Sequence, residues 1–421
     1  MLDNLDLDSI YLGDPAFWDR HDRYDWLARF RRERPVTWQA GRTVEGFPTS
    51  PGFWSLTGHA EVRAVSRDTK RFTSEFGTQL FSENSENAYL TGGMLIIDPP
   101  RHTKLRKIVS RAFTPRMLQA IEQQMDRRAR AVVGRVASWG ACDFASDIAT
   151  RMPMGVICDM MEVPEDDWLE LQCLTIQALG FGDAEVGEFG DAFEAFMALN
   201  DYGEGLCRSR RKAPTEDLIS ALIAAEVDGE RLSDLDVGIF FQLLITAGIE
   251  TTSSSIAHGM AQLAGHPDQR ADWMADYEGL VASALEEIVR YSSPVVNFAR
   301  TATKDLELGG QAIAAGDKVV MWYTAANRDE TVFEEPERFD IRRWPNDHVG
   351  YGGGGVHHCL GMHLARREMY HFFKILFETL PDLDVDLDRL VPINGLFIHG
   401  VRSLPCTFSP LNYRKMPHNR S

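Results

Sequence analysis

The chain has 421 residues, of which 44% are hydrophobic and 25% are charged, the balance of an ordinary globular protein. Its 44 Lys and Arg against 62 Asp and Glu give a net charge of −18, which argues against a nucleic-acid partner. The acidic N-terminus does not predict a signal peptide, and the longest apolar run, Val237–Ile249, is too short for an integral membrane segment. Six scattered Cys without a CxxC pair indicate reduced thiols, so we expect a cytoplasmic protein.

The apolar pattern predicts a helix-dominated chain with small sheets. We find neither strand–helix alternation nor a repeat, so we expect one mainly α domain over all 421 residues. Within it, β-richer parts are expected near residues 35–60, 295–325 and 385–410, and the helical bulk at residues 100–292 and 360–380.

Residues 234–265 predict one long central helix, capped by Ser233 with Asp236 three residues later. Its first half is apolar on all sides and should be buried. Glu250 and Thr251 then interrupt the apolar pattern, although a buried carboxylate is costly unless it is paired or takes part in chemistry. The segment is therefore either a kink with satisfied hydroxyls or a proton-delivery pair beside an active centre.

A second helical segment contains Glu287 and Arg290, whose spacing places them on one face. Such a pair is usually a solvated surface pair of little stabilising value. Arg338, in the sequence Pro-Glu-Arg-Phe, could supply a second Arg to Glu287.

A glycine cluster, Gly350–Gly361, contains Cys359 and precedes another helical stretch. Glycines permit close approach of the backbone to a bulky neighbour. A phosphate-binding loop is excluded because no Gly-Lys-Ser/Thr follows, and a zinc site is excluded because a second Cys pair is missing. What remains is a thiolate at a helix N-terminus, where the helix dipole lowers a thiol pKa. Such a thiolate suits haem iron.

Together these segments resemble the cytochrome P450 superfamily of haem-thiolate monooxygenases, in that family's order along nearly the whole chain. Ala247–Thr252 is similar to its oxygen-activation motif, and Gly350–Gly361 to its Cys-ligand loop. The resemblance makes Glu287, Arg290 and Arg338 a buried structural triad. One departure is visible: the family usually has Phe seven residues before the Cys, whereas Gly352 stands there and Tyr351 precedes it.

The resemblance implies a helix-dominated triangular prism with haem b between the long central helix and the Cys-ligand loop. Cys359 would be the axial iron ligand. Thr251 would hold an oxygen-derived ligand by hydrogen bonds, and Glu250 would relay protons to it. The haem propionates would be held by His102, Arg106, Arg300 and His357.

The electron donor implied by the resemblance is a ferredoxin served by its reductase. On the helix that carries His102 and Arg106, the opposite face is basic, and it is either a solvated face or a ferredoxin dock. The residues of this basic face are Arg101, Lys104, Lys107 and Arg111.

The closest resemblance is to bacterial methyl-branched lipid ω-hydroxylases and cholesterol side-chain hydroxylases, over stretches such as Glu286–Arg290, Ser293–Val296, Ala326–Asp329 and Phe397–Gly400. It implies that O2 and ferredoxin electrons hydroxylate the terminal methyl of a branched fatty acid, isoprenoid or sterol side chain. The alternatives are a biosynthetic hydroxylase or epoxidase of a terpene or polyketide scaffold, and a haem-binding sensor or carrier. We expect a monomer with an apolar pocket. Its candidate residues, each of which could equally be ordinary core, are Leu95, Leu179, Phe193, Leu243, Ala247, Val295, Val296 and Phe397.

Overall fold

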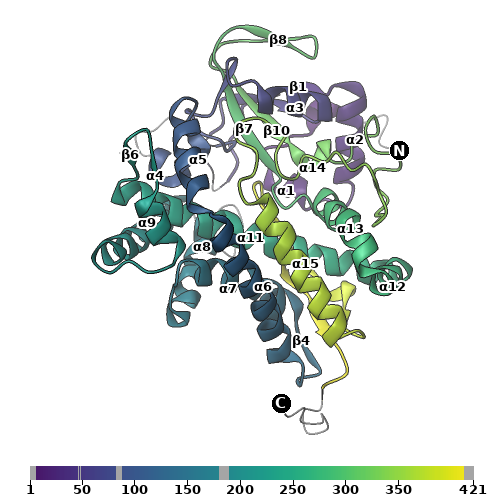
Figure 1. Cartoon of the computed structure of the whole chain (residues 1–421). Helices are drawn as coiled ribbons and strands as arrows, with labels where there is room; N and C mark the ends of the chain where they lie inside the picture. Colours follow the sequence, from purple (N-terminus) through teal and green to yellow (C-terminus); the bar gives the residue numbers. More distant parts are fainter. Residues whose placement is uncertain (1–5, 46, 48, 82–87, 180–188, 412–421) are drawn as a thin grey trace, which may run out of the picture.

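The structure is a computed structural model that describes residues 6–45, 47, 49–81, 88–179 and 189–411 (Figure 1). Most of these residues are helical, so the prediction of a mainly α fold with small sheets is confirmed. The α-helices are α1 (Pro15–Trp18), α2 (Arg23–Glu33), α3 (His59–Arg67), α4 (Ala88–Gly92), α5 (Arg101–Ala112), α6 (Pro115–Val136), α7 (Arg151–Met160), α8 (Trp168–Leu179), α9 (Phe189–Lys212), α10 (Leu218–Ala224), α11 (Asp234–Gly265), α12 (Pro267–Ala275), α13 (Tyr277–Ser292), α14 (Tyr323–Ala326) and α15 (Met362–Thr379). Shorter 3-10 or π turns are η2 (Leu7–Ser9), η3 (Gly93–Ile96), η4 (Phe144–Ala149), η5 (Glu165–Asp167) and η6 (Leu387–Arg389).

The strands form small separate sheets. They are β1 (Val36–Ala40), β2 (Gly52–Leu56), β3 (Phe72–Thr73), β4 (Ala141–Asp143), β5 (Glu226–Val227), β6 (Glu230–Arg231), β7 (Asn297–Ala302), β8 (Leu306–Leu308), β9 (Gln311–Ile313), β10 (Lys318–Trp322), β11 (Asp384–Val385), β12 (Val391–Asn394), β13 (His399–Ser403) and β14 (Pro405–Thr407). The largest sheet has the order β1-β2-β10-β7-β3, in which β10 runs parallel to β2 and the other neighbours are antiparallel. Aromatic side chains from α1 and α2 cover one face of this sheet.

The predicted central helix is confirmed as α11, whose 32 residues make a rod of about 48 Å. At its start the Ser233 hydroxyl accepts from the Asp236 N–H at 3.0 Å, and the Asp236 carboxylate accepts from the Ser233 N–H at 3.0 Å. The helix crosses the middle of the molecule, behind α6 and α15 in Figure 1, and its apolar side chains join the main core. Among the described helices it is the one long and apolar enough to cross a membrane, but 56% of its most apolar window is buried inside the protein, as in a core helix.

The C-terminal part of the described chain completes two small sheets. β14 is the central strand of the sheet β11-β14-β4, so it pairs with residues that lie far apart in sequence. Strand β13 pairs with β12 and lies along α11. Both sheets therefore cover the long helix with residues from late in the chain.

Candidate active site

Cys359 lies in the turn that leads into α15, as predicted for a thiolate at a helix N-terminus. Its own N–H donates to the Tyr351 carbonyl at 3.0 Å, which fixes the loop around it. Burial raises the pKa of the Cys359 thiol, although the N–H groups of Gly361 and Met362 and the charges of Arg106 and Arg366 act in the opposite direction. The lowered thiol pKa expected from the helix dipole is therefore not found in the protein alone, because burial outweighs the donors.

The glycines before Cys359 permit a close approach of the loop to helix α3, and not to a bulky bound group. Gly354 and Gly355 have positive φ angles, and a Cβ on Gly355 would lie 2.6 Å from the Ser66 carbonyl oxygen. The Arg67 side chain and the Ser66 hydroxyl also donate to carbonyls of this loop. The glycines thus press the loop against α3. At Gly361, by contrast, a Cβ would meet nothing within 4 Å, so open space lies beside the cysteine.

Four basic side chains predicted to bind one group come together near Cys359. The rings of His102 and His357 lie 4.3 Å apart, and the charges of Arg106 and Arg300 act on both rings. Burial, followed by the neighbouring charges of His357 and Arg106, lowers the pKa of His102 to about 4. The acid facing this group is Asp98, which lies 3.9 Å from His357.

This cluster fits the propionate end of a haem. Burial lowers the pKa of Arg300, whose guanidinium donates to the carbonyl of its neighbour Ala299 at 2.7 Å. The buried Nδ1 of His102 has no hydrogen-bond partner among the described residues. Buried cationic and polar groups with so few acceptors are costly unless an anionic partner joins them. A group with two carboxylates, placed between Cys359 and α11, would satisfy them.

One face of α11 carries the predicted oxygen-activation residues. Ala247 is exposed although it lies in the middle of the central helix, so no side chain of the described protein covers it. The Thr251 hydroxyl donates to the Ala247 carbonyl at 2.6 Å. Glu250 has no ion-pair partner among the described residues, and burial raises its pKa to about 7. A carboxyl with this pKa can donate and regain a proton near neutral pH.

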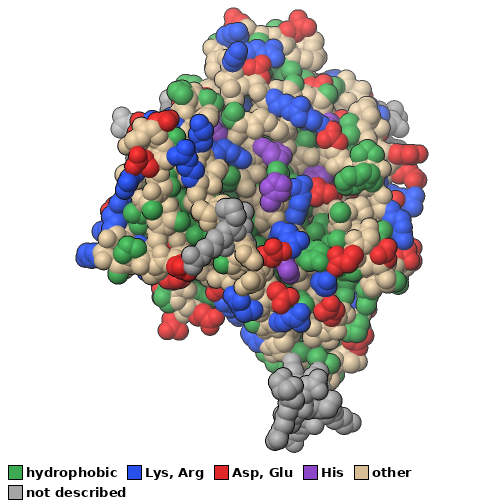
Figure 2. Space-filling view, in the orientation of Figure 1, with side chains coloured by type: hydrophobic (Ala, Val, Ile, Leu, Met, Phe, Trp, Pro, Cys, Tyr) green, Lys and Arg blue, Asp and Glu red, His purple; other side chains and the backbone are tan. Residues whose placement is uncertain are grey.

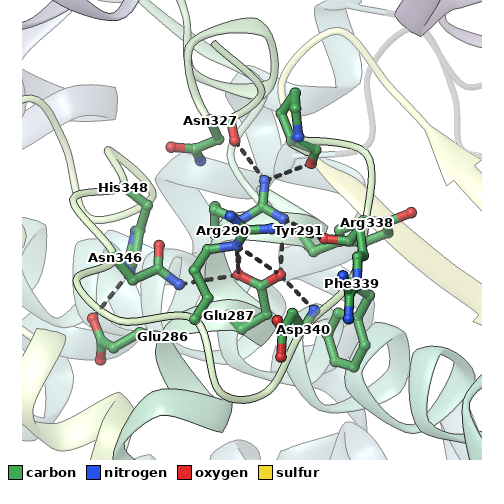
Figure 3. Close-up of polar contacts among 12 residues, drawn as sticks. Glu286, Glu287, Arg290, Tyr291, Asn327, Arg338, Phe339, Asp340, Asn346 and His348 are labelled. Carbon is green, nitrogen blue, oxygen red and sulfur yellow. Dashed lines mark hydrogen bonds and ion pairs between the residues drawn. The ribbon is translucent and has the colours of Figure 1, made fainter. Parts of the chain in front are cut away.

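Figure 3 shows the network around Glu287, which lies on α13. Glu287 and Arg290 are both fully buried and form two hydrogen bonds, of 2.7 and 2.8 Å. The prediction that Arg338 completes the triad is wrong. The Arg338 side chain is exposed and pairs with Glu335, and only its carbonyl joins the network, accepting from Arg290 at 3.2 Å. The second guanidinium is that of Arg343, which lies 3.2 Å from Glu287.

This correction gives the first testable prediction. Arg343→Ala should lower the free energy of unfolding by about 3 kcal/mol, because it leaves the buried Glu287 carboxylate with one cation fewer. Chemical denaturation of the haem-bound protein measures the change. Arg338→Ala is the matched control and should leave the midpoint unchanged. If the two variants lose equal stability, the assignment of the third residue to Arg343 fails.

The predicted pocket residues do not all face the same space. Val295 and Phe298 pack on one face of the large sheet, whereas Val296, which lies just before β7, is 1% exposed in the aromatic core on the other face. The assignment of Val296 to the substrate pocket is therefore wrong. The Phe397 ring meets the Phe298 ring edge-on at 5.3 Å.

Leu243 lines an apolar pocket between η3, α5 and α11, one helical turn before Ala247. Leu95 is partly buried on η3, next to this pocket. Leu179 packs against a small cluster of α8 and α9, and Phe193 on α9 is 39% exposed. The structure therefore places Leu243, Ala247 and Thr251 on one face of α11. Leu179 and Phe193, on α8 and α9, lie outside this row of residues.

The predicted basic face of α5 is largely engaged within the chain. Lys104 pairs with Glu230, and Arg111 donates to the Glu226 carbonyl, both on the β5–β6 hairpin. The Arg101 guanidinium lies over the Tyr89 ring at 4.5 Å. Lys107 is exposed, and the structure shows no partner for it among the described residues.

Two buried groups near the site were missed from the sequence. Glu368 on α15 is 1% exposed, burial raises its pKa to about 8, and its Oε2 has no partner among the described residues. Tyr351 lies under the Arg366 guanidinium at 4.6 Å. Tyr351 stands in the Cys-ligand loop, but the sequence does not indicate its contact with Arg366. Glu368 belongs to no motif, so only the helical spacing that turns it inward could have indicated it.

The sequence and the fold are similar to those of known proteins. Residues 191–278 and 279–389 match the family model described as cytochrome P450. The chain is 41% identical over 407 residues to the methyl-branched lipid omega-hydroxylase of Mycobacterium tuberculosis, covering 95% of each protein. It is 37% identical over 375 residues to the steroid C26-monooxygenase of Rhodococcus jostii, covering 88% of this chain and 79% of that protein. Its fold matches Mycobacterium marinum CYP268A2 in complex with pseudoionone with a TM-score of 0.88 and 41% identity, over 96% of this chain and 100% of that one.

Proposed function

Because the chain belongs to the cytochrome P450 family and is a haem-dependent monooxygenase, we propose that it hydroxylates the terminal methyl group of an apolar chain: a methyl-branched fatty acid, an isoprenoid or a sterol side chain. By their names, the two curated relatives described above act on a methyl-branched lipid and on a steroid. The proposal places the haem between Cys359 and α11, where it supplies the activation of O2.

The observation that carries the proposal is the order of side chains along one face of α11. Leu243, Ala247 and Thr251 follow one another at intervals of one turn, so the face changes from apolar to polar toward the reaction centre. An apolar chain lying along Leu243 and past the small Ala247 would end beside the Thr251 hydroxyl. Such a channel restricts approach to the end of a chain, which a terminal hydroxylase needs because a methyl C–H bond is stronger than that of a methylene.

The residues of this site have separate tasks in the proposal. Thr251, held by the Ala247 carbonyl, presents its hydroxyl oxygen toward the reaction centre. Glu250, with a pKa of about 7, donates a proton there and takes another from water. The cluster of His102, Arg106, Arg300 and His357 orients the cofactor through its carboxylates.

The experiment that tests the proposal compares substrates in binding and in turnover. Titration of the haem absorption spectrum with methyl-branched fatty acids should give saturable shifts, and mass spectrometry should locate the hydroxyl on a terminal carbon. Ala247→Leu should weaken binding at least about tenfold, because the larger side chain fills the channel. Tight binding of fused-ring or macrocyclic scaffolds, with no binding of branched chains, would contradict the proposal and favour a biosynthetic role.

We further propose that a ferredoxin in the cytoplasm donates the electrons, through the face drawn in Figure 2. This face carries Lys and Arg side chains over α5 and around a group of His, with acidic side chains between them. Of the four cations of the predicted docking face, Lys107 is exposed and has no partner among the described residues.

Lys107→Glu should slow reduction by an acidic ferredoxin several-fold at low ionic strength, and salt should diminish the difference. Stopped-flow reduction under carbon monoxide measures the rate. Lys212→Glu, an exposed cation at the end of α9, is the matched control. Equal rates for the wild type and both variants would refute the dock.

A further inference from the structure

A polar stripe continues along α11 beyond the reaction centre. Glu250, Ser254 and His258 follow one another at intervals of four residues, so they share one side of the helix. Ser254 is buried, although its side chain is polar. This stripe leads away from Thr251 toward the C-terminal half of the helix.

Strand β13 covers the stripe and brings a second histidine to it. The Ser254 hydroxyl lies 3.0 Å from the position that a Cβ would take on Gly400, so a glycine there leaves room above the hydroxyl. The His258 and His399 rings lie 4.4 Å apart. Because the Ser292 carbonyl, 2.7 Å from Nδ1 of His399, can only accept, that nitrogen carries the proton and Nε2 is left as an acceptor.

Beyond His399 the stripe reaches a second pocket, which Trp18, Arg23, Tyr24 and Thr324 also line. This pocket lies between the N-terminal helices α1 and α2 and the start of β13. It offers a connection between the buried histidines and the surface region of Arg23.

Buried polar atoms along this line have no partner among the described residues. They are Nε2 of His258, Oγ of Ser292 and Oγ1 of Thr324; the Ser292 and Thr324 side chains are 3% and 2% exposed. A buried polar group of this kind normally binds an ordered water molecule. Three of them in one region mark a place where water can be held in a row.

We propose that Ser254, His258 and His399 line a water-filled proton path, which connects the pocket beneath Trp18 and Arg23 with Glu250. Protons pass along the water molecules, each of which accepts one proton and releases one, so nothing is oxidised and no side chain of the path changes charge. Ser254 and the histidine Nε2 atoms position the water and are not themselves the proton source. The inference rests on the proposed role of Glu250, since the path replaces the proton that Glu250 donates.

The charges around the histidines suit this role. Burial, with Arg23 and Arg328 nearby, lowers the pKa of His258 to about 4 and that of His399 well below its usual value. Both rings therefore stay neutral at physiological pH and keep an acceptor nitrogen for water. No carboxylate pairs with either ring among the described residues, so the two histidines are not part of an ion-pair network.

The test follows the carboxyl proton of Glu250 in the haem-bound protein without substrate. In D2O near pH 6 the infrared band of this carboxyl, identified by its loss in Glu250→Gln, shifts as the proton exchanges. His258→Phe and Ser254→Ala should each slow the exchange about tenfold, and His258→Gln, which keeps an acceptor oxygen, should restore it. The band of Glu368, on another helix, is the internal reference, and His266→Phe at the end of α11 is the control.

An exchange rate that neither His258→Phe nor Ser254→Ala changes would overturn the proposal, as would an equal slowing in His266→Phe or of the Glu368 band. A crystal structure of the protein is the second test. It is expected to contain ordered water beside Nε2 of His258 and Oγ1 of Thr324. A dry region would also overturn the path. Neither test uses a lipid, so a wrong substrate assignment leaves both outcomes unchanged.

Discussion

Replacing Cys359 by Ala is expected to abolish the red-shifted Soret band of the dithionite-reduced, carbon monoxide-bound protein, together with its oxygenase activity. The thiolate is the electron-rich ligand that the reaction needs, and the structure offers no second thiol in the turn before α15. The Gly361 and Met362 N–H groups that face the sulfur have no comparable partner in the variant. Absorption spectra of both proteins measure the change.

The control for this experiment is Cys173→Ala, which removes an exposed thiol on α8 and should keep the wild-type band. A band typical of histidine-ligated haem in the wild type would contradict the ligand assignment and favour a sensor or carrier. Retention of the red-shifted band in Cys359→Ala would show that another residue ligates the iron.

Replacing Thr251 by Ala should lower the product formed per NADH about tenfold or more, with the lost electrons recovered as hydrogen peroxide. The variant removes the hydroxyl that the Ala247 carbonyl holds in place, so proton delivery loses the acceptor oxygen that positions water at the reaction centre. NADH, product and peroxide are measured together, with a surrogate ferredoxin and its reductase. Thr252→Ala, the adjacent but buried threonine, should stay close to wild type. Unchanged coupling in Thr251→Ala would refute its role.

The same assay has an expected pH dependence. The pKa of Glu250 is raised to about 7, so the carboxyl is protonated below that pH and loses its proton as the pH rises through it. Coupling in the wild type should therefore fall as the pH rises above about 7. Glu250→Gln should be poorly coupled at every pH and lack this step.

The local features of the fold could be predicted from the sequence, because they depend on neighbours in the chain. The Ser233 cap of α11 and the Glu287–Arg290 pair follow from spacing alone, and both are found. The third residue of the network could not be derived in this way. Both Arg338 and Arg343 lie within reach of Glu287, and the turn between them decides which side chain points inward.

The errors at the site have similar physical causes. Val296 is apolar like Val295, and only the pairing of the extended chain shows that it faces the other side of the sheet. The basic face of α5 was expected to be available, but the β5–β6 hairpin, whose docking no local pattern reveals, covers part of it. The balance between burial and helix dipole at Cys359 likewise depends on the whole environment of the loop.

The position of β14 between β11 and β4 has a consequence for biosynthesis. Strand β4, at residues 141–143, remains unpaired until its partner β14, at residues 405–407, has been synthesised. Strand β13, which covers Ser254 and His258, is also synthesised late. The ribosome therefore releases nearly the entire chain before the long helix is enclosed. Because β13 and the Cys359 loop both lie late in the chain, the site beside α11 is completed only near the end of synthesis.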